Sequence, residues 1–422
     1  MTPDLTASQL LGLIVAALLL QAVVVTGVAI RRGAKARDAG PEPEPSDEST
    51  TSATRTPAAW AGTRAWRVRE RRMEDEAASQ CSFLLEPLDG SAPPPFKPGQ
   101  FLTFVLDLAD PRAANGRRTV TRCYSLSNGP GHDHYRVTIK RVAAPPDHPD
   151  WPAGQVSGHF HDHVQVGDVL HVRAPSGHFH LDEEADLPVV LIAGGIGITP
   201  MVSMLDWLER HQPGRPVHLY YGVRNRREHA LRDHLKAVQT RHPALRLHVV
   251  YSRPGDEEIL GVDHHHVGHV DIGLLQRTLP HGRHRFYLCG PGSMMGTLVP
   301  ALKTWGVPDE DVRFEAFGPA SVPRASGPAP VAESRGAAAL DIRFRRSGRL
   351  LPWDGEDASL LDFAERHAVP IDSGCRSGGC GTCMTRLLEG RVAYAHSPDH
   401  DVPAGHCLPC VARPMTALVL EA

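Results

Sequence analysis

The sequence has little excess charge, few aromatic side chains and few cysteines for its length. Its 422 residues carry a formal net charge of −3 at pH 7, so they offer no strong field of one sign for binding nucleic acid. Eight cysteines are too few for a disulfide scaffold in a chain of this size. A hydrophobic content of 41% with 22% charged residues is ordinary for globular proteins, which excludes a wholly disordered or fibrous chain.

Glycine and proline, in contrast, are abundant, with 39 and 37 residues. This excess indicates many turns, loops and linkers. A single core is not expected, because cores stop growing near ~250–300 residues and a domain usually takes roughly 150. The chain is therefore expected to be multidomain.

One long hydrophobic run lies near the amino end. Residues 10–30 contain only Gln21 and Thr26 as polar residues, and a helix of this length spans about 31 Å, the thickness of a bilayer core. A cleaved secretory signal would have a basic start and a shorter apolar run. Basic residues follow the run directly, namely Arg31, Arg32, Lys35 and Arg37. By the positive-inside rule we expect a transmembrane anchor with a basic flank over residues 1–37 and catalytic domains in the cytoplasm.

Composition divides the remainder of the chain. Residues 38–62 are rich in proline, serine, threonine and acidic residues, which is typical of a disordered linker. Residues 63–183 alternate short apolar runs with turns, which predicts an antiparallel β-barrel. Residues 184–318 alternate apolar strands with helical stretches, which predicts a doubly wound α/β domain. Residues 319–337 form a second linker, and a last domain covers residues 338–422.

A short polar motif, Arg122-Cys123-Tyr124-Ser125-Leu126-Ser127-Asn128, lies in the expected barrel. Residues two apart share one face of a strand, so Arg122 and Tyr124 point the same way. A guanidinium can bind a pyrophosphate bidentately, while a phenol can stack on a flat ring. The Ser125 hydroxyl could hydrogen-bond a ring nitrogen. By itself, Arg-x-Tyr-Ser fits an ordinary amphipathic strand equally well.

Three segments together resemble the flavin-contacting segments of the ferredoxin–NADP reductase superfamily: RCYSLSN, VTIKRV at 137–142 and GQVSGHFHD at 154–162. The following AP-x-G-x-F segment at 174–179 adds a likeness to the flavohaemoglobin reductase module. The resemblance implies a domain that binds FAD, with FMN as the less favoured flavin. The flavin-binding residues that it implies are Arg122, Tyr124, Ser125, Leu126, Ile139, Lys140, Val156 and Ser157.

A glycine-rich turn, Gly194-Gly195-Ile196-Gly197-Ile198-Thr199-Pro200, follows the first apolar strand of the α/β domain. Glycines at such a turn let backbone N–H groups approach a pyrophosphate at the positive end of a helix. The turn lacks the usual G-x-G-x-x-G pattern, and a generic glycine turn is the alternative. It resembles the superfamily's own version, in which the helix follows Thr-Pro. This implies coenzyme binding by Gly194, Gly195, Gly197, Thr199 and Pro200.

Three further sites carry the same resemblance. Tyr221, Arg224 and Asn225 surround the end of the second strand, where the adenosine ribose would lie. Ser252 and Arg253 stand where NADPH-using relatives keep a Ser-Arg pair for the 2′-phosphate. A plain turn is the alternative at that pair, so the expected coenzyme is NAD(P)H, with NADH and NADPH left open.

The end of a later strand, Cys289-Gly290-Pro291, is the third of these sites. The resemblance places Cys289 beside the nicotinamide carbon that gives up hydride, and a small buried core residue is the alternative. It also implies that Phe317 covers the flavin until nicotinamide enters. Ser125, Cys289 and Phe317 are therefore the candidate catalytic residues.

Four histidines lie close together in the same domain, namely His264, His265, His266 and His269. They suggest a metal site, but no cysteine or carboxylate accompanies them at ligand spacing. We therefore expect a solvated loop here.

Cysteines in the last domain have a characteristic spacing. Cys375, Cys380 and Cys383 form Cys-x4-Cys-x2-Cys, the plant-type [2Fe–2S] arrangement, on a loop rich in glycine. A zinc site would usually show two Cys-x2-Cys pairs. Cys407 and Cys410 compete as the fourth ligand, and the CVARP segment resembles the ending found in plant-type ferredoxins. The resemblance implies an α+β β-grasp fold, with Cys410 as the fourth ligand and Cys407 as a spare thiol.

The domain order of flavin, nicotinamide and ferredoxin resembles phthalate dioxygenase reductase and related oxygenase reductases. It implies a membrane-anchored NAD(P)H-dependent oxidoreductase that passes electrons from NAD(P)H through FAD and [2Fe–2S] to an acceptor protein. An oxygenase, a desaturase, a hybrid-cluster protein and a haem protein all fit as acceptors. Because it lies beside the cluster ligands, Arg376 is a candidate docking residue; tuning of the cluster or pairing with a flavin-domain carboxylate is the alternative.

Two alternatives to this function exist. A respiratory NADH:quinone reductase component joins similar domains to an anchor, but there the ferredoxin domain precedes the flavin domain. A non-catalytic redox sensor or electron carrier could keep the cluster, but it would not need RCYSLSN, GGIGITPM and CGPG together.

Overall fold

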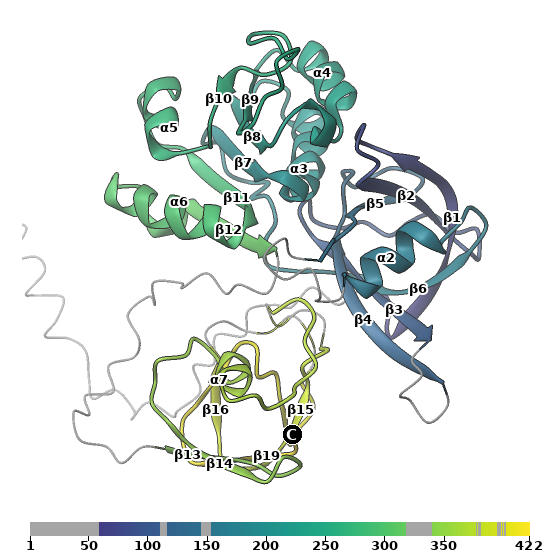
Figure 1. Ribbon diagram of the computed structural model, residues 1–422, viewed down its shortest axis with the longest axis vertical. Helices are drawn as coiled ribbons and strands as arrows, with labels where there is room; N and C mark the ends of the chain where they lie inside the picture. Colours follow the sequence, from purple (N-terminus) through teal and green to yellow (C-terminus); the bar gives the residue numbers. More distant parts are fainter. Residues whose placement is uncertain are drawn as a thin grey trace, which may run out of the picture. The chain divides into compact units, whose positions relative to one another are not determined.

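The structure is a computed structural model that describes residues 59–109, 116–144, 153–317, 340–376, 378, 381–394, 398, 400 and 402–422. These residues form three folded regions, each built on a β-sheet (Figure 1). The expected barrel, nucleotide-binding and ferredoxin-like folds fit these regions in the expected chain order.

The expectation of a membrane-spanning helix is corrected by the structure. Within the described ranges no helix is both long and apolar enough to cross a membrane. The longest of them, α3 (Ile198–His211), has 14 residues, whereas a span takes about 20 apolar residues. The expected anchor at residues 1–37 lies outside the described residues. An apolar run shows only that a segment can be buried. The predictions of a transmembrane helix and of a membrane location are therefore not supported.

The first region is an antiparallel sheet that closes into a barrel. Its strands lie in the order β4-β3-β6-β1-β2-β5. They are β1 (Thr63–Met73), β2 (Gln80–Pro87), β3 (Phe101–Ala109), β4 (Arg117–Ser125), β5 (Tyr135–Lys140) and β6 (Val169–Ser176). An isolated bridge between Leu126 and Val137 joins the two edges beyond β4. Alternate side chains fill the interior, and helix α2 (Gln155–Asp162) adds Phe160 to it.

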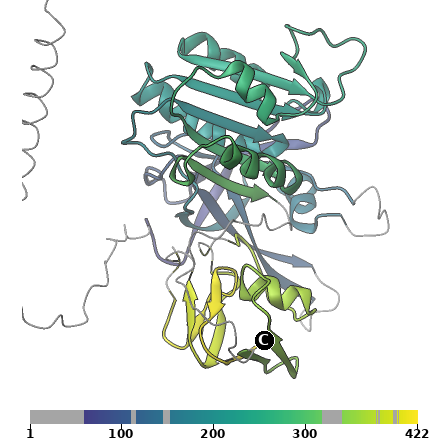
Figure 2. The same ribbon diagram turned by 90° about the vertical axis from the view of Figure 1, so that its left-hand side faces the viewer.

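The second region is a parallel sheet with helices on both faces (Figure 2). Its strands, in the order β10-β9-β8-β7-β11-β12, are β7 (Val189–Gly194), β8 (Val217–Val223), β9 (Leu245–Tyr251), β10 (His266–Val267), β11 (Arg285–Pro291) and β12 (Val312–Phe317). α3 and α4 (Arg232–Arg241) cover one face, and α5 (Ile272–Thr278) and α6 (Gly292–Thr304) cover the other. Strand order reverses around β7, and ligands of such folds bind beyond the strand ends at that point.

The third region is a small mixed sheet covered by helix α7 (Leu360–Arg366). Its strands are β13 (Leu340–Phe344), β14 (Arg349–Trp353), β15 (Thr385–Glu389), β17 (His406–Cys407) and β19 (Leu418–Leu420), in the order β14-β13-β19-β15-β17. A separate pair joins β16 (Val392–Tyr394) to β18 (Ala412–Pro414). β13 pairs parallel with β19 and antiparallel with β14, as in an α+β fold.

Hydrogen bonds from the first helix of the second region hold the barrel and the nucleotide domain together. The Ser203 hydroxyl of α3 donates to the Asn128 carbonyl at 2.9 Å and accepts from the Gly99 N–H at 3.3 Å. Asp206, one turn further along α3, accepts from the Gly129 N–H and from His132 Nε2, each at 2.7 Å. The segment after β4 is thereby fixed against α3.

Candidate flavin, coenzyme and cluster sites

Strand β4 presents the expected flavin-binding side chains. Arg122 is exposed, and its Nη1 donates to the Thr121 carbonyl at 2.7 Å, while Ser125 and Leu126 are buried. The Tyr124 ring packs edge-on against Phe104 and Phe160, with centroids 5.7 and 5.4 Å away. Burial raises the pKa of the Tyr124 phenol well above its usual range, so the group stays neutral. A neutral phenol beside an exposed guanidinium suits a flat ring that carries a phosphate tail.

Helix α2, whose Phe160 packs against Tyr124, leaves its first turn open. No side chain caps its N-terminus, and the first amide with a partner in the helix is that of Gly158, which donates to the Gly154 carbonyl at 2.8 Å. The Ser157 hydroxyl is engaged with backbone groups, since it accepts from the Val142 N–H at 3.1 Å and donates to the Gly154 carbonyl. The backbone of Val156 and Ser157, rather than their side chains, therefore fits the phosphate of a flavin nucleotide.

Strand β5 supplies the remaining two expected residues in different ways. Ile139 is fully buried in the barrel core, and its carbonyl contacts Nε2 of His161 at 2.9 Å. Lys140 is half-buried, and its Nζ donates to Glu228 Oε2 of the nucleotide domain at 3.1 Å. Lys140 thus joins the two domains as well as lying next to the expected flavin site.

Glycines at the ends of β7 and β11 allow these strands to meet without side chains between them. A Cβ on Gly197 would lie 2.1 Å from the Cys289 carbonyl oxygen, so only glycine fits there. A Cβ on Gly194 would meet Pro291 at 2.7 Å. Helix α3 starts at Ile198 with no side-chain cap, and Thr199 is buried with its hydroxyl donating to the Ile196 carbonyl at 3.0 Å. The expected pyrophosphate turn is therefore at the switch point of the sheet.

Cys289 is completely buried at the same place. Burial, together with the nearby Glu315, raises the pKa of its thiol well above its usual range, so the thiol is neutral. Phe317 ends β12 in register with Pro291 and packs, half-buried, against the core of the nucleotide domain. The structure thus brings Cys289, Pro291 and Phe317 to one edge of the sheet.

Backbone contacts also unite the expected adenosine-binding residues. The Arg253 N–H donates to the Arg224 carbonyl at 2.8 Å, and both side chains are exposed. The Asn225 side chain accepts from the Glu228 N–H at 3.3 Å and so caps the short helix that follows β8. Tyr221 differs from the expectation, because its ring is fully buried in the core. Its side chain belongs to packing, since both faces of central strand β8 are covered.

The histidine segment is not a wholly solvated loop. His264 is buried and stacks on Tyr251, with centroids 4.7 Å apart. His265 accepts the Val249 N–H at 2.9 Å, and His266 belongs to β10. His265 and His269 are exposed and lie outside the strand, as expected for a solvated loop. The short edge strand β10 pairs with β9, so this segment lies against the sheet. Hydropathy alone does not predict that pairing.

Two of the expected cluster ligands meet in the third region. The Sγ atoms of Cys383 and Cys410 lie 3.1 Å apart, and both cysteines are free thiols in one small buried group. Their hydrogen bond lowers the pKa of Cys383 and raises that of Cys410, so one thiol of the pair ionises easily while the other holds its proton. Cys375 lies close enough to influence both electrostatically, and Cys380 lies outside the described residues.

The surroundings of this pair fit an iron–sulfur group. Gly381 has a φ of +69°, and a Cβ there would lie 2.3 Å from Nε2 of His400, so the loop needs glycine at this position. Cys407 is fully buried among apolar residues, and burial raises the pKa of its thiol to about 12. Cys410 lies 3.1 Å from Cys383, whereas Cys407 belongs to the apolar core under the sheet, and this placement supports Cys410 as the fourth ligand. Among the residues described, no group of three or more histidine, cysteine, aspartate or glutamate side chains surrounds a single metal position.

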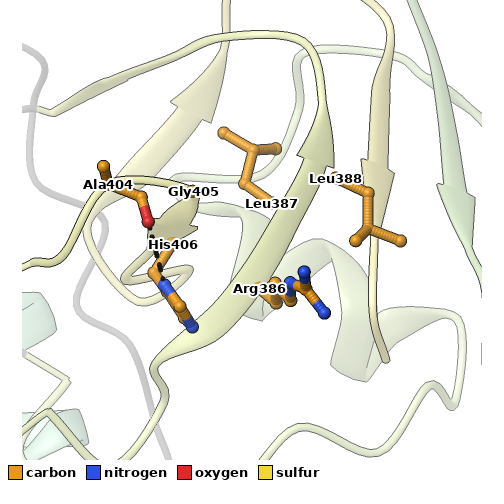
Figure 3. A pocket seen from close by; sticks show the side chains of 6 residues that line it. All are labelled: Arg386, Leu387, Leu388, Ala404, Gly405 and His406. Carbon is orange, nitrogen blue, oxygen red and sulfur yellow. Dashed lines mark hydrogen bonds between the residues drawn. The ribbon is translucent and has the colours of Figure 1, made fainter.

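Two other features of this region bear on the docking of an acceptor protein, namely Arg376 and a hollow beside the sheet. Arg376 pairs with Glu365 and, at 3.5 Å, with Asp362, both on α7, so its charge is neutralised within its own region. A hollow of about 500 Å³ opens beside β15 and β17 (Figure 3). It is lined by Arg386, Leu387, Leu388, Ala404, Gly405 and His406. His406 immediately precedes the buried Cys407, so this hollow belongs to the ferredoxin-like fold alone.

Sequence reasoning missed the residues that join the two nucleotide-binding regions. Ser203, Asp206 and Glu228 all contact the barrel across the joint. The isolated serine in the apolar run PMVSML of α3 was an available signal, because a buried hydroxyl requires a partner. Nothing comparable marks Glu228 in the sequence.

Family models match three parts of the chain. The oxidoreductase FAD-binding domain matches residues 96–181, and the oxidoreductase NAD-binding domain matches residues 191–299. The 2Fe-2S iron-sulfur cluster binding domain matches residues 344–415. These three matches agree with the three folded regions.

Individual relatives cover between 61% and 86% of the chain. A flavohemoprotein of Halalkalibacterium halodurans is 35% identical over 268 residues, which are 64% of this chain and 63% of that protein. The chain therefore spans less than two thirds of the length of this relative. The FAD/NAD-binding domain of a nitric oxide dioxygenase from Vibrio cholerae is 30% identical, covers 61% of this chain and 99% of that chain, and has a TM-score of 0.52. A structure of phthalate dioxygenase reductase is 27% identical over 86% of this chain and 98% of that chain, with a TM-score of 0.49.

Proposed function

We propose that this chain is an NAD(P)H-dependent oxidoreductase of the ferredoxin–NADP reductase type, with FAD-, NAD- and [2Fe–2S]-binding domains, and that it delivers single electrons to a separate acceptor protein. When bound, FAD would take two electrons as hydride from NAD(P)H, and a [2Fe–2S] cluster would release them one at a time. The acceptor that we propose is a haem protein or an oxygenase. The name of the flavohemoprotein relative indicates both flavin and haem. This supports a haem protein as the acceptor of this chain.

One observation carries the reductase part of the proposal. Ser203 lies in the helix that follows the glycine-rich turn, and it is hydrogen-bonded to Asn128, the last residue of the expected flavin motif. The two motifs are thus held by a direct bond between the elements that carry them. Hydride transfer needs the two rings within contact of each other, and a rigid joint supplies that orientation.

The residues of the chain have distinct proposed tasks. Arg122 and the open first turn of α2 bind flavin phosphate, while Tyr124 and Ser125 orient the ring. The buried, neutral Cys289 thiol and Phe317 exclude water from the place where nicotinamide meets the flavin. In the third region Cys375, Cys380, Cys383 and Cys410 hold the cluster.

The test measures two acceptors with the holoprotein. The chain should oxidise NAD(P)H with ferricyanide, because a small oxidant reaches the flavin directly, and it should also reduce cytochrome c. A Cys410→Ser variant should keep most ferricyanide turnover and lose most cytochrome c reduction. Full cytochrome c reduction by a cluster-free variant would contradict the route through the cluster, and an absence of ferricyanide turnover in the natural protein would contradict the reductase.

A further inference from the structure

Glu228 occupies the joint between the expected flavin and coenzyme sites. Its Oε2 accepts from Lys140 of the barrel at 3.1 Å, and its Oε1 accepts from Arg224 at 3.2 Å. The Glu228 side chain is only 20% exposed, whereas that of Arg224 is 65% exposed. One carboxylate therefore links the barrel to an arginine at the coenzyme edge.

The backbone around Glu228 is fixed from two sides. Its N–H donates to the Asn225 side chain at 3.3 Å, and its carbonyl accepts from Gln80 of the barrel at 3.2 Å. The carboxylate therefore cannot leave Arg224 by a simple shift of the chain. Its position is set by the fold, and not only by the attraction of the ion pair.

Arg224 and Arg253 are neighbours at this edge, since the Arg253 N–H donates to the Arg224 carbonyl. NADPH differs from NADH by a 2′-phosphate, which an exposed arginine at this edge would bind strongly. Glu228 opposes this in two ways: it occupies one donor of Arg224, and it adds a negative charge 3.2 Å from that guanidinium.

We propose that Glu228 is a specificity-determining residue that favours NADH over NADPH by neutralising Arg224. This inference rests on the proposed function, because it assumes that coenzyme binds at the edge formed by Arg224 and Arg253. Glu228 contacts Arg224 and Lys140 and acts on the coenzyme only through Arg224, so it is a positioning residue. This preference between NADH and NADPH arises when the coenzyme binds and does not depend on hydride transfer.

The experiment compares two nucleotides that differ by the 2′-phosphate. Binding of 5′-AMP and of 2′,5′-ADP to the holoprotein is measured by calorimetry, together with kcat/KM for NADH and NADPH with ferricyanide. Glu228→Gln removes the negative charge beside Arg224, so we expect 2′,5′-ADP to bind about fivefold to tenfold more tightly and 5′-AMP to stay within about twofold. The NADPH-to-NADH ratio of kcat/KM should rise by the same factor, from a natural protein that prefers NADH.

A matched control separates this effect from loosening of the joint. Glu76 pairs with Arg226 across the same joint at 3.1 Å and does not touch Arg224. Glu76→Gln should leave both affinities unchanged, and adding Arg224→Gln to Glu228→Gln should cancel the gain. The inference is overturned if Glu228→Gln changes both nucleotides equally or not at all, if Glu76→Gln gives the same shift, or if the natural protein prefers NADPH. Selective tightening of 2′,5′-ADP in a protein that fails to oxidise NAD(P)H would support the inference and contradict the proposed function.

Discussion

The sulfur atoms of Cys383 and Cys410 lie 3.1 Å apart although 26 residues separate them in the sequence. The pKa of the Cys383 thiol is lowered and that of the Cys410 thiol is raised by the hydrogen bond between them. These two cysteines are the pair that we propose to bind one iron of the [2Fe–2S] cluster.

The first prediction tests this pair. Cys410→Ser should abolish the visible absorption of the cluster and lower the iron content, because one of the four thiolates is lost. Cys407→Ala should keep both, since Cys407 is buried in the apolar core and not in the small buried group that holds Cys383 and Cys410. Absorbance and iron analysis of the purified proteins provide the measurement. If the two variants exchange these outcomes, Cys407 is the ligand.

The second prediction concerns flavin binding. Arg122→Ala should weaken FAD binding by roughly tenfold or more, the size of a lost charge-assisted hydrogen bond, without lowering the unfolding temperature because Arg122 is exposed. Arg67, an exposed arginine of the same barrel that pairs with Glu86 at 3.5 Å, is the control. The ratio of flavin to protein absorbance after dilution gives the affinity. Equal loss of flavin in Arg67→Ala would assign the effect to the barrel rather than to Arg122.

The third prediction concerns the meeting of β7 and β11. Gly197→Ala should destabilise the nucleotide domain by about 2 kcal/mol, because its Cβ would overlap the Cys289 carbonyl. Gly296→Ala in α6, where a Cβ would meet nothing within 4 Å, should instead stabilise the protein by up to about 1 kcal/mol. Thermal unfolding of both variants checks the two signs. Unchanged stability in Gly197→Ala would mean that the strand ends separate at little cost.

The fourth prediction is a dependence on pH. Burial alone would raise the pKa of Asp206, but hydrogen bonds from His132 and the Gly129 N–H lower it from 3.8 to about 2. A folded pKa below the unfolded value gives stability that is complete above about pH 4 and is lost as the pH falls toward 2. The shift corresponds to about 2 kcal/mol.

Asp206→Asn should therefore lower the unfolding free energy at pH 6 and flatten its dependence between pH 4 and 2. Asp309, which pairs with Lys303 at 3.3 Å and is mostly exposed, is the control, because an exposed pair contributes little. Denaturant unfolding at several pH values measures the unfolding free energy of Asp206→Asn and of the control Asp309→Asn. A pH profile in Asp206→Asn that matches the natural protein would contradict this assignment.

Local patterns in the sequence determined the sheets and the motifs. Alternating apolar residues predicted the barrel strands, near-continuous runs such as VVLIAG predicted buried parallel strands, and Cys-x4-Cys-x2-Cys indicated the cluster loop. These predictions depend on interactions between residues that are close in sequence, so spacing and side-chain type suffice. The apolar run at residues 10–30 was equally local, yet it did not establish a membrane-spanning helix.

Only the tertiary structure decided which residues from distant segments meet. Tyr221 follows an apparently suitable strand end, but helices cover both faces of β8 and bury its ring. His264 was expected in solvent, and pairing of β10 with β9 carries it onto Tyr251 instead. Glu228 has no motif at all, and it acquires a role only because the barrel brings Lys140 to the nucleotide domain. Burial and charge pairing depend on contacts between distant parts of the chain, and a linear pattern does not contain them.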